Sequence, residues 1–260
     1  MPQEIIKVSN LTKKFNKLTA VDAISFSVNE GEIFGFLGPN GAGKSTTINI
    51  LCTILKPTSG TAIVTCCDVT AEPHRVRKEI GIIFQDPSLD DRLTAEDNLR
   101  FHGYLYHMPV KIIDNRITEV LNLVELYDRR KEFVRKFSGG MKRRLEIARG
   151  LMHQPKVLFL DEPTLGLDPQ TRAHIWDYIL KTRKETGLTI FMTTHYMQEA
   201  EVCDRVAVID HGKIIELDTP ANLKQKYQET TLEGVFLKIT GKEIRAQAGE
   251  SAWTQWMRRP

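Results

Sequence analysis

The chain of 260 residues is long enough to bury a full hydrophobic core without a disulfide or a structural metal. Its 41% hydrophobic and 27% charged residues exclude a largely disordered, collagen-like or coiled-coil chain. Lysine and arginine number 36 against 33 aspartate and glutamate, and an excess of +3 is too small to indicate nucleic acid as a partner.

In the first half of the chain, the pattern of apolar residues predicts strands followed by helices. Apolar residues alternate with serines over 24–28, which is the period of a half-buried strand. Residues 33–37 form an apolar run typical of a buried strand. A helix is expected over 44–55, because apolar side chains recur on one face until Lys56 and Pro57.

Helical patterns dominate about residues 86–153, with helices expected at 112–127 and 138–152. Strand patterns then return at 157–160, 189–192, 205–210 and 213–217, the last two forming a hairpin. Strands that alternate with helices predict an α/β fold with a mostly parallel sheet and an inserted helical part.

A glycine-rich sequence lies between the strand at 33–37 and the helix that follows. It matches the phosphate-binding pattern G-x-x-x-x-G-K-[ST]. Glycines let backbone N–H groups turn toward phosphate oxygens, and the helix N-terminus adds partial positive charge. Lys44 is expected to bridge the β- and γ-phosphates, and the Ser45 hydroxyl to bind Mg²⁺. The predicted nucleotide-binding residues of this loop are Gly38, Pro39, Asn40, Gly41, Ala42, Gly43, Lys44, Ser45 and Thr46.

An acidic pair ends the apolar strand at 157–160. An open α/β sheet binds ligands at the carboxyl ends of its strands. Asp161 is therefore expected to hold Mg²⁺ through water, and Glu162 to orient or deprotonate the attacking water. A plain helix N-cap is the alternative interpretation of this pair. The sequence contains no Asn-Lys-x-Asp guanine-binding motif, which favours ATP over GTP.

A second phosphate-binding pattern opens the helix at 138–152. Ser138, Gly139 and Gly140 place a hydroxyl and two unhindered N–H groups at a helix start, an arrangement that binds anions. A helix cap without a ligand is the alternative.

The order and spacing of these motifs resemble the ATP-binding-cassette (ABC) ATPases over roughly residues 4–220. Met141 stands where glutamine is usual, and Leu165-Gly166 where Ser-Ala is familiar; these features look most like the ATPase subunits of drug and lipo-oligosaccharide exporters, closest to the daunorubicin-resistance type. The motifs that carry the resemblance are the glycine-rich loop, Gln85, Phe137 to Met141, Asp161-Glu162, Leu165 to Asp168, and His195.

The resemblance implies a P-loop NTPase fold with a mostly parallel central sheet, an N-terminal antiparallel β subdomain and an inserted α-helical subdomain at about 86–153. It also implies an ABC ATPase domain over 1–220. Residues 221–260 would form a short C-terminal extension, with helices expected at 221–227 and 232–239, and a tail.

The same resemblance implies that two such domains pair head to tail around two ATP molecules, as a homodimer or a heterodimer. Ser138, Gly139 and Gly140 of one chain would then bind the nucleotide held by the other. Asp168 would lie along the seam between the chains.

Three further roles rest on the resemblance. Gln85 would sense Mg²⁺ and the attacking water, and His195 would contact the γ-phosphate and hold Glu162. Phe15 falls where an aromatic ring stacks on adenine. The alternatives are a solvated loop residue, a structural histidine and a core phenylalanine.

The expected function is that of the ATP-hydrolysing subunit of an exporter of drug-like or lipidic compounds. A separate membrane permease would be its partner, contacted through residues 85–97, and would hold it at the cytoplasmic face of the plasma membrane. A soluble ABC ATPase that acts on DNA or ribosomes is the alternative.

Other features are less specific. The four cysteines lack CxxC spacing, which favours a reduced cytoplasmic protein without zinc. Neither a signal peptide nor a membrane-spanning segment is expected. Residues 142–144 (Lys-Arg-Arg) are expected on a solvated helix face, with a nucleic-acid patch as the alternative. The tail carries Trp253, Trp256, Met257, Arg258 and Arg259, expected to be frayed, with a membrane or partner contact as the alternative.

Overall fold

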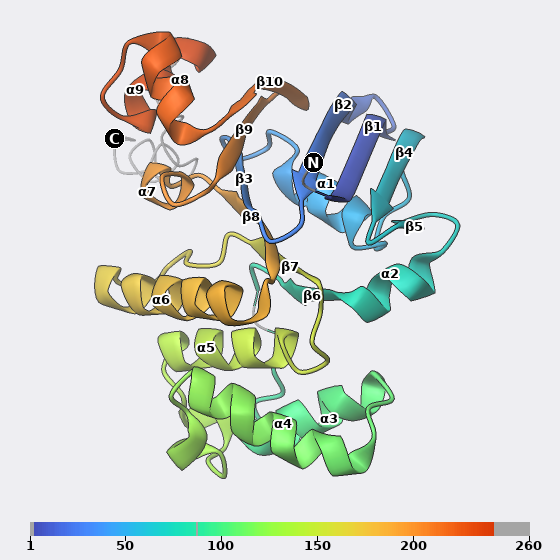
Figure 1. Ribbon diagram of the computed structural model, residues 1–260, viewed down its shortest axis with the longest axis vertical. Helices are drawn as coiled ribbons and strands as arrows, with labels where there is room; N and C mark the ends of the chain where they lie inside the picture. Colours follow the sequence, from blue (N-terminus) through green and yellow to red (C-terminus); the bar gives the residue numbers. More distant parts are fainter. Residues whose placement is uncertain (1–2, 87, 242–260) are drawn as a thin grey trace, which may run out of the picture.

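The computed structural model describes residues 3–86 and 88–241, which form two sheets and a helical lobe (Figure 1). One sheet is antiparallel, in the order β2-β1-β4-β5. Its strands are β1 (Glu4–Phe15), β2 (Leu18–Asn29), β4 (Ser59–Val64) and β5 (Cys67–Asp68).

The central sheet has the order β10-β9-β3-β8-β7-β6, and all of its strand pairs are parallel except β9 with β10. This arrangement confirms the predicted fold class and the predicted hairpin. The strands are β3 (Ile33–Leu37), β6 (Ile80–Ile83), β7 (Val157–Asp161), β8 (Thr189–Thr194), β9 (Arg205–Asp210) and β10 (Lys213–Asp218).

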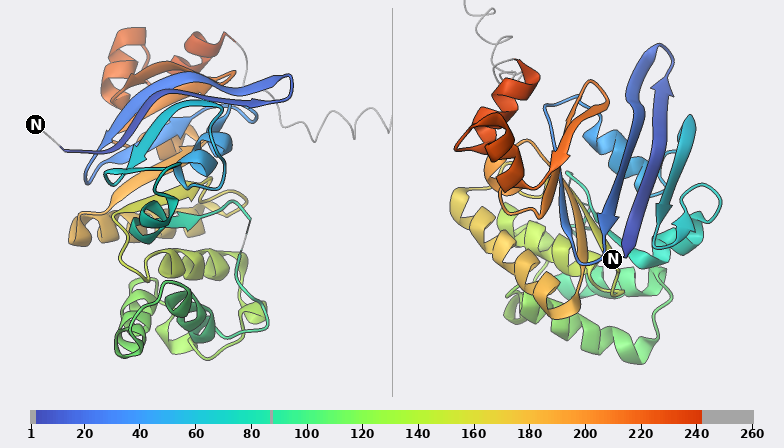
Figure 2. Two further views of the ribbon diagram at one scale, coloured as in Figure 1. Left: turned by 90° about the vertical axis from the view of Figure 1, so that its right-hand side faces the viewer. Right: turned by 45° about the horizontal axis from the view of Figure 1, so that its top comes forward.

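The helices fall into three groups. The helical lobe lies at one end of the molecule, and a C-terminal pair of helices lies at the other end (Figures 1 and 2). The lobe contains α3 (Ala95–Leu105), α4 (Val110–Leu123) and α5 (Gly139–Gly150), and the C-terminal pair is α8 (Pro220–Tyr227) and α9 (Leu232–Thr240). The remaining helices are α1 (Lys44–Leu51), α2 (Pro73–Glu79), α6 (Pro169–Thr186) and α7 (Met197–Ala200).

The central sheet is buried on both faces, which explains the continuous apolar runs in its strands. In β3, Phe34 and Phe36 join the cluster beneath the antiparallel sheet, where Phe26 of β2 lies 5.5 Å from Phe34 between ring centroids. Ile33 and Leu37 point to the opposite face and join the cluster formed with the lobe helices. Because side chains of a strand alternate between faces, one five-residue strand serves both cores.

Three parallel strands end side by side at the edge where the predicted motifs lie. The order β3-β8-β7 places the glycine-rich loop after β3, Glu162 after β7 and His195 after β8. The topology therefore brings together residues more than 100 positions apart in the sequence.

Two predicted helix boundaries are wrong. The helix expected over 44–55 ends at Leu51, because the N–H groups of Ile54 and Leu55 both bond to the carbonyl of Asn49 and Thr53 has φ 63°. The helix expected over 112–127 is α4, Val110–Leu123; its end is followed by Glu125 at φ 54°.

Several elements of the structure were not predicted with a residue range of their own. They are the strands β1, β4, β5 and β6 and the helix α2. The C-terminal helices were expected at 221–227 and 232–239, and α8 and α9 confirm both with a shift of one residue at an end. In the described ranges no helix combines the length and the apolar character needed to cross a bilayer. The tail residues Trp253 to Arg259 lie outside the described residues.

A cluster of aromatic rings joins the lobe to Ile80, the first residue of β6. The His153 ring stacks on Tyr106 at 3.8 Å between centroids, His102 lies 4.6 Å from Tyr106, and His153 Nε2 lies 2.9 Å from the Ile80 carbonyl. Burial, and then the charge of Arg149, lowers the pKa of His102 to about 3. Burial also lowers the pKa of His153. Both imidazoles therefore stay neutral in the folded protein at neutral pH.

This cluster makes the free energy of unfolding depend on pH. An unfolded His102 titrates near 6.5 and the folded one near 3, so between these pH values the unfolded state binds more protons and stability falls as pH falls. We expect His102→Phe, which keeps a ring but cannot titrate, to reduce the loss of unfolding free energy between pH 7.5 and pH 5 by about 1–2 kcal/mol. Urea unfolding at the two pH values measures this loss. The exposed His174→Phe is the matched control; equal losses in wild type and His102→Phe would contradict the assignment.

Candidate active site

A cavity of about 470 Å³ opens at the carboxyl edge of the central sheet. This volume lies in the ordinary range for small-molecule sites. Nine of the predicted site residues line it together: Phe15, Asn40, Gly41, Gly43, Lys44, Ser45, Thr46, Gln85 and Glu162. The remainder of the wall comes from Leu18, Thr19, Ala20, His211 and Gly212. Phe15 is 42% exposed, so it does not belong to the core.

Two glycines of the loop cannot be replaced without moving the backbone. A Cβ on Gly43 would lie 2.4 Å from the Ala20 carbonyl oxygen, and its φ of 107° disfavours other residues. A Cβ on Gly38 would lie 2.3 Å from the Ile209 carbonyl oxygen. The loop is therefore pressed against neighbouring backbone, which fixes its shape around the start of α1.

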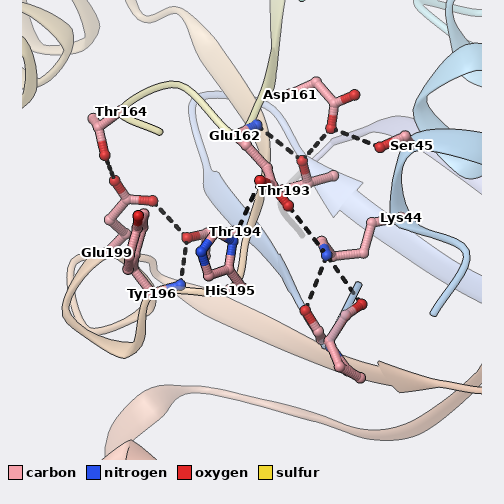
Figure 3. A network of polar contacts seen from close by, with 12 residues as sticks. Lys44, Ser45, Asp161, Glu162, Thr164, Thr193, Thr194, His195, Tyr196 and Glu199 are labelled. Atoms are coloured by element: carbon pink, nitrogen blue, oxygen red, sulfur yellow. Dashed lines mark hydrogen bonds and ion pairs between the residues drawn. The ribbon is translucent and has the colours of Figure 1, made fainter. Parts of the chain in front are cut away.

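Lys44 reaches from α1 into the centre of the loop and across to β7. Its Nζ donates hydrogen bonds to the carbonyls of Gly38 at 2.9 Å and Pro39 at 3.2 Å, and lies 3.3 Å from Glu162 Oε1 (Figure 3). The other carboxylate oxygen of Glu162 lies 3.3 Å from Nδ1 of His195. Lys44 and Glu162 are only 4% and 8% exposed, so these charges interact in a largely dry environment.

Opposing effects act on the pKa values of this pair. Burial works to raise the pKa of Glu162, but the contacts with His195 and Lys44 outweigh it and hold that pKa below its usual value. Burial lowers the pKa of Lys44, with Glu162 and Asp161 opposing the shift. Glu162 is thus an ionised carboxylate at neutral pH, as a group that orients or accepts a proton from water requires.

Asp161 points toward the loop from the end of β7. Its Oδ1 accepts hydrogen bonds from the hydroxyls of Ser45 at 3.2 Å and Thr193 at 2.5 Å. A hydroxyl beside a carboxylate, with the amide of Gln85 on the same cavity wall, is an all-oxygen donor set that suits Mg²⁺ when phosphate and water complete the shell. The residues present therefore fit a Mg²⁺ ion.

Ser138, Gly139 and Gly140 do not line this cavity. Ser138 caps α5 by accepting from the Met141 N–H at 3.3 Å, and Ser138 and Gly140 border a separate pocket of about 190 Å³. Asp168 caps α6 and accepts from Thr171, whose methyl lies against Gly140. The predicted second phosphate-binding surface and Asp168 are thus neighbours of each other, apart from Lys44.

The expectation of a solvated face at 142–144 is wrong for Arg143, which is 7% exposed. The cause is a set of buried acceptors around its guanidinium. Arg143 donates to the carbonyls of Pro163 at 2.5 Å and Phe84 at 2.6 Å, and pairs with Glu146 at 3.0 Å. A buried charge with full hydrogen bonding is tolerated where a lone one is not. The neighbouring Lys142 and Arg144 are half-buried.

Arg143 and Glu146 join the site to the lobe. Glu146, 1% exposed, accepts a hydrogen bond from the Ser88 N–H at 2.8 Å. The pair on α5 therefore contacts the backbone just before Gln85, the backbone just after it, and the turn after Glu162. These contacts join the lobe to the backbone on both sides of Gln85.

Thr193 is a site residue that the sequence analysis missed. Besides its bond to Asp161, its hydroxyl oxygen accepts the Glu162 N–H at 3.1 Å, and its carbonyl accepts the same N–H at 3.2 Å. Glu162 itself has φ 48°, a left-handed conformation that is costly for a residue other than glycine. The two polar residues Thr193-Thr194 at the end of a buried strand, just before His195, were the available signal.

Comparison with known proteins agrees with this geometry. The family model described as ABC transporter matches residues 21–165, which is more than half of the chain. The linearmycin resistance ATP-binding protein of Bacillus subtilis is 43% identical over 91% of this chain and 76% of its own. The daunorubicin/doxorubicin resistance ATP-binding protein of Streptomyces peucetius is 42% identical over 95% and 74%.

Solved structures show the same fold. An ATP-binding subunit of an ABC transporter superposes with a TM-score of 0.82 at 25% identity, covering 91% of this chain and 99% of that one. The ATP-binding cassette MJ0796, dimeric and bound to ADP and phosphate, superposes with a TM-score of 0.74 at 29% identity, covering 82% and 98%.

The chain therefore belongs to the ABC transporter family. It is an ATP-binding cassette of that family and an ATPase.

The Arg143–Glu146 pair yields a stability prediction. We expect Arg143→Met to lower the unfolding free energy by about 3–5 kcal/mol, because it removes the ion-pair partner of the buried Glu146. The double variant Arg143→Met, Glu146→Leu removes both charges and should recover much of that loss. Lys142→Met is the control, since its pair with the half-exposed Asp91 contributes at most about 1 kcal/mol. Denaturant unfolding measures all three; a double variant less stable than Arg143→Met would contradict the prediction.

Proposed function

We propose that this chain is the ATP-binding subunit of an exporter, and that its ATP hydrolysis drives efflux of a drug-like or lipidic compound through a separate membrane permease. The observation that carries the proposal is the buried contact of Lys44, Glu162 and His195 inside a cavity walled by a phosphate-binding loop. The resistance proteins that share more than 40% of its residues support the choice of drug-like cargo.

In the proposed hydrolysis, Glu162 orients the attacking water and accepts its proton, and the ionised state of its carboxylate supports this role. His195 holds Glu162 and contacts the γ-phosphate. Lys44 exchanges its bonds to the loop carbonyls for bonds to the β- and γ-phosphates. Ser45, Gln85 and Asp161 would hold Mg²⁺, which would stabilise phosphate charge electrostatically when bound.

Nucleotide recognition extends over the remaining predicted residues. Phe15 stacks on the adenine; its 42% exposure and its place on the cavity wall support this role. The loop from Gly38 to Thr46 encloses the phosphates. These roles are consistent with the cavity lining.

We propose that the working form is a head-to-tail pair of cassettes, either two copies or one copy with a relative. Ser138, Gly139 and Gly140 would bind the nucleotide of the partner, with Asp168 along the seam. Their separation from the cavity of their own chain supports this arrangement, since a single chain leaves both anion-binding surfaces open. The dimeric cassette among the solved structures supports it as well.

The permease contact is proposed for the segment from Gln85 to Asp97, and it would place the chain at the cytoplasmic face of the plasma membrane. Gln85 lies on the cavity wall, whereas Asp97 lies in the first turn of α3 in the lobe. The segment therefore connects the site to the lobe. One of the solved relatives, cbiO1 of Clostridium perfringens, is described as part of an ABC transporter complex.

The chemistry is tested by Glu162→Gln. The amide keeps the size of the side chain but cannot accept the proton, so we expect ATP to bind while hydrolysis falls by about 10²–10⁴-fold. An ATP-bound dimer should accumulate, visible by size-exclusion chromatography with ATP and Mg²⁺. Lys44→Ala is the comparison, because it should weaken nucleotide binding itself. Turnover by Glu162→Gln near that of the wild type would rule out the assigned role.

The cellular role is tested by fractionation. Expressed alone, the full chain should stay in the supernatant, and with its permease it should sediment with membranes. Substitution across the segment 85–97 should abolish the shift, while substitutions on α8 should not. A chain that sediments with ribosomes or binds DNA would instead support the alternative of an ABC ATPase with a soluble target.

A further inference from the structure

We infer that Glu199 is a positioning residue that sets the distance between Glu162 and His195. The inference rests on the proposed roles of those two residues in hydrolysis. Glu199 lies on the short helix α7, four positions after His195, and is 2% exposed. It is a buried carboxylate that the proposed chemistry does not use.

Both oxygens of the Glu199 carboxylate accept hydrogen bonds from threonine hydroxyls (Figure 3). Oε1 accepts from Thr164, and Oε2 accepts from Thr194 at 2.5 Å. The Thr194 hydroxyl oxygen also accepts the Tyr196 N–H at 2.9 Å, so its proton is committed to Glu199. The carboxylate therefore forms a bridge between two chain segments.

The two segments are those that carry the catalytic side chains. Thr164 follows Glu162 by two residues, and Thr194 directly precedes His195. The bridge thus fixes the backbone on either side of the 3.3 Å contact between Glu162 Oε2 and His195 Nδ1. A displacement of about 1 Å at a reacting group is enough to lower a rate about 100-fold.

Thr193 provides the complementary restraint. It binds the Glu162 N–H and the Asp161 carboxylate, so β7 and β8 are joined directly at their ends. That contact does not reach the turn after Glu162, which Arg143 holds from the lobe side at the Pro163 carbonyl. Glu162, at φ 48°, is in a conformation that the backbone does not prefer. The Glu199 bridge to Thr164 holds this turn in place.

Charge also argues for a specific role. In the part of the chain that the structure describes, the hydrogen bonds of the Glu199 carboxylate come from hydroxyl groups and none from a cationic side chain. Burying a carboxylate without a cation is costly unless every lone pair is well bonded. An apolar side chain of similar volume would fill the space, but it could not hold Thr164 and Thr194 together.

The first test separates positioning from folding. We expect Glu199→Gln to lower kcat for ATP about 10–100-fold while the dissociation constant for ATP changes less than about threefold, because the loop around Lys44 is untouched. Glu201→Gln, two positions later at the end of α7 and paired with Lys224 at the surface, is the matched control and should keep the wild-type kcat. Thermal unfolding of both variants shows whether they are folded.

The second test uses the partners of the bridge. Thr164→Val and Thr194→Val keep the side-chain shape and remove only the hydroxyl, so each should lower kcat, whereas the corresponding serine variants should restore it. Adding Thr164→Val to Glu199→Gln should change kcat less than twofold, because the same bridge is already broken. A merely structural Glu199 would lower the thermal midpoint and leave kcat of the folded fraction unchanged.

Two outcomes overturn the inference, and they are distinguishable. If Glu162→Gln is inactive but folded Glu199→Gln and Thr164→Val hydrolyse ATP at the wild-type rate, Glu199 is not a positioning residue and the proposed function stands. If Glu162→Gln itself hydrolyses ATP normally, the proposed roles of Glu162 and His195 fall, and the inference falls with them.

Discussion

The contact of Lys44, Glu162 and His195 is the interaction on which the rest of the structure depends. Lys44 comes from the start of α1, Glu162 follows β7 and His195 follows β8, so none of the three is near the others in sequence. The Lys44 ammonium and the Glu162 carboxylate are only 4% and 8% exposed, so small displacements change their interaction energy strongly. The hydrophobic clusters on the two faces of the central sheet support this contact, because they hold in place the strands that carry these residues.

A second layer of buried polar groups surrounds that contact. Arg143 and Glu146 hold the turn after Glu162 and the segment at Gln85, and Thr193 holds the start of that turn. These groups lie on elements from the lobe and from the central sheet. The lobe is therefore attached to the site by directional hydrogen bonds as well as by apolar packing.

Much of this could be predicted from local patterns. The glycine-rich loop, the apolar strand before Asp161 and the start of α5 are each marked by a pattern of only a few consecutive residues. The sequence of the long strand β1 does not alternate regularly between apolar and polar residues. Its pairing with β2 and β4 contains several register shifts, which break that alternation. The end of α1 was missed because a single residue, Thr53, adopts a left-handed conformation.

The missed polar residues share a different cause. The acceptors of Arg143 are backbone carbonyls about 20 and 59 positions away, and the partner of Thr193 is 32 positions away. A basic residue on an otherwise charged helix gives no local indication that such acceptors surround it. Pairings of this kind are fixed by the topology of the sheet, and only the folded structure brings them together.

The order of the strands also sets the distance between the glycine-rich loop and the acidic pair Asp161-Glu162. Because β8 lies between β3 and β7, the phosphate loop and the acidic pair are held two strand spacings apart, about 9–10 Å between the strand axes. Were β3 and β7 hydrogen-bonded neighbours, their ends would be only about half as far apart, and the side chains of Lys44 and Glu162 would have less room between them. The interposed strand β8 thus sets the distance across which the side chains of Lys44 and Glu162 reach each other. A side chain much shorter than lysine at position 44 could not make that contact.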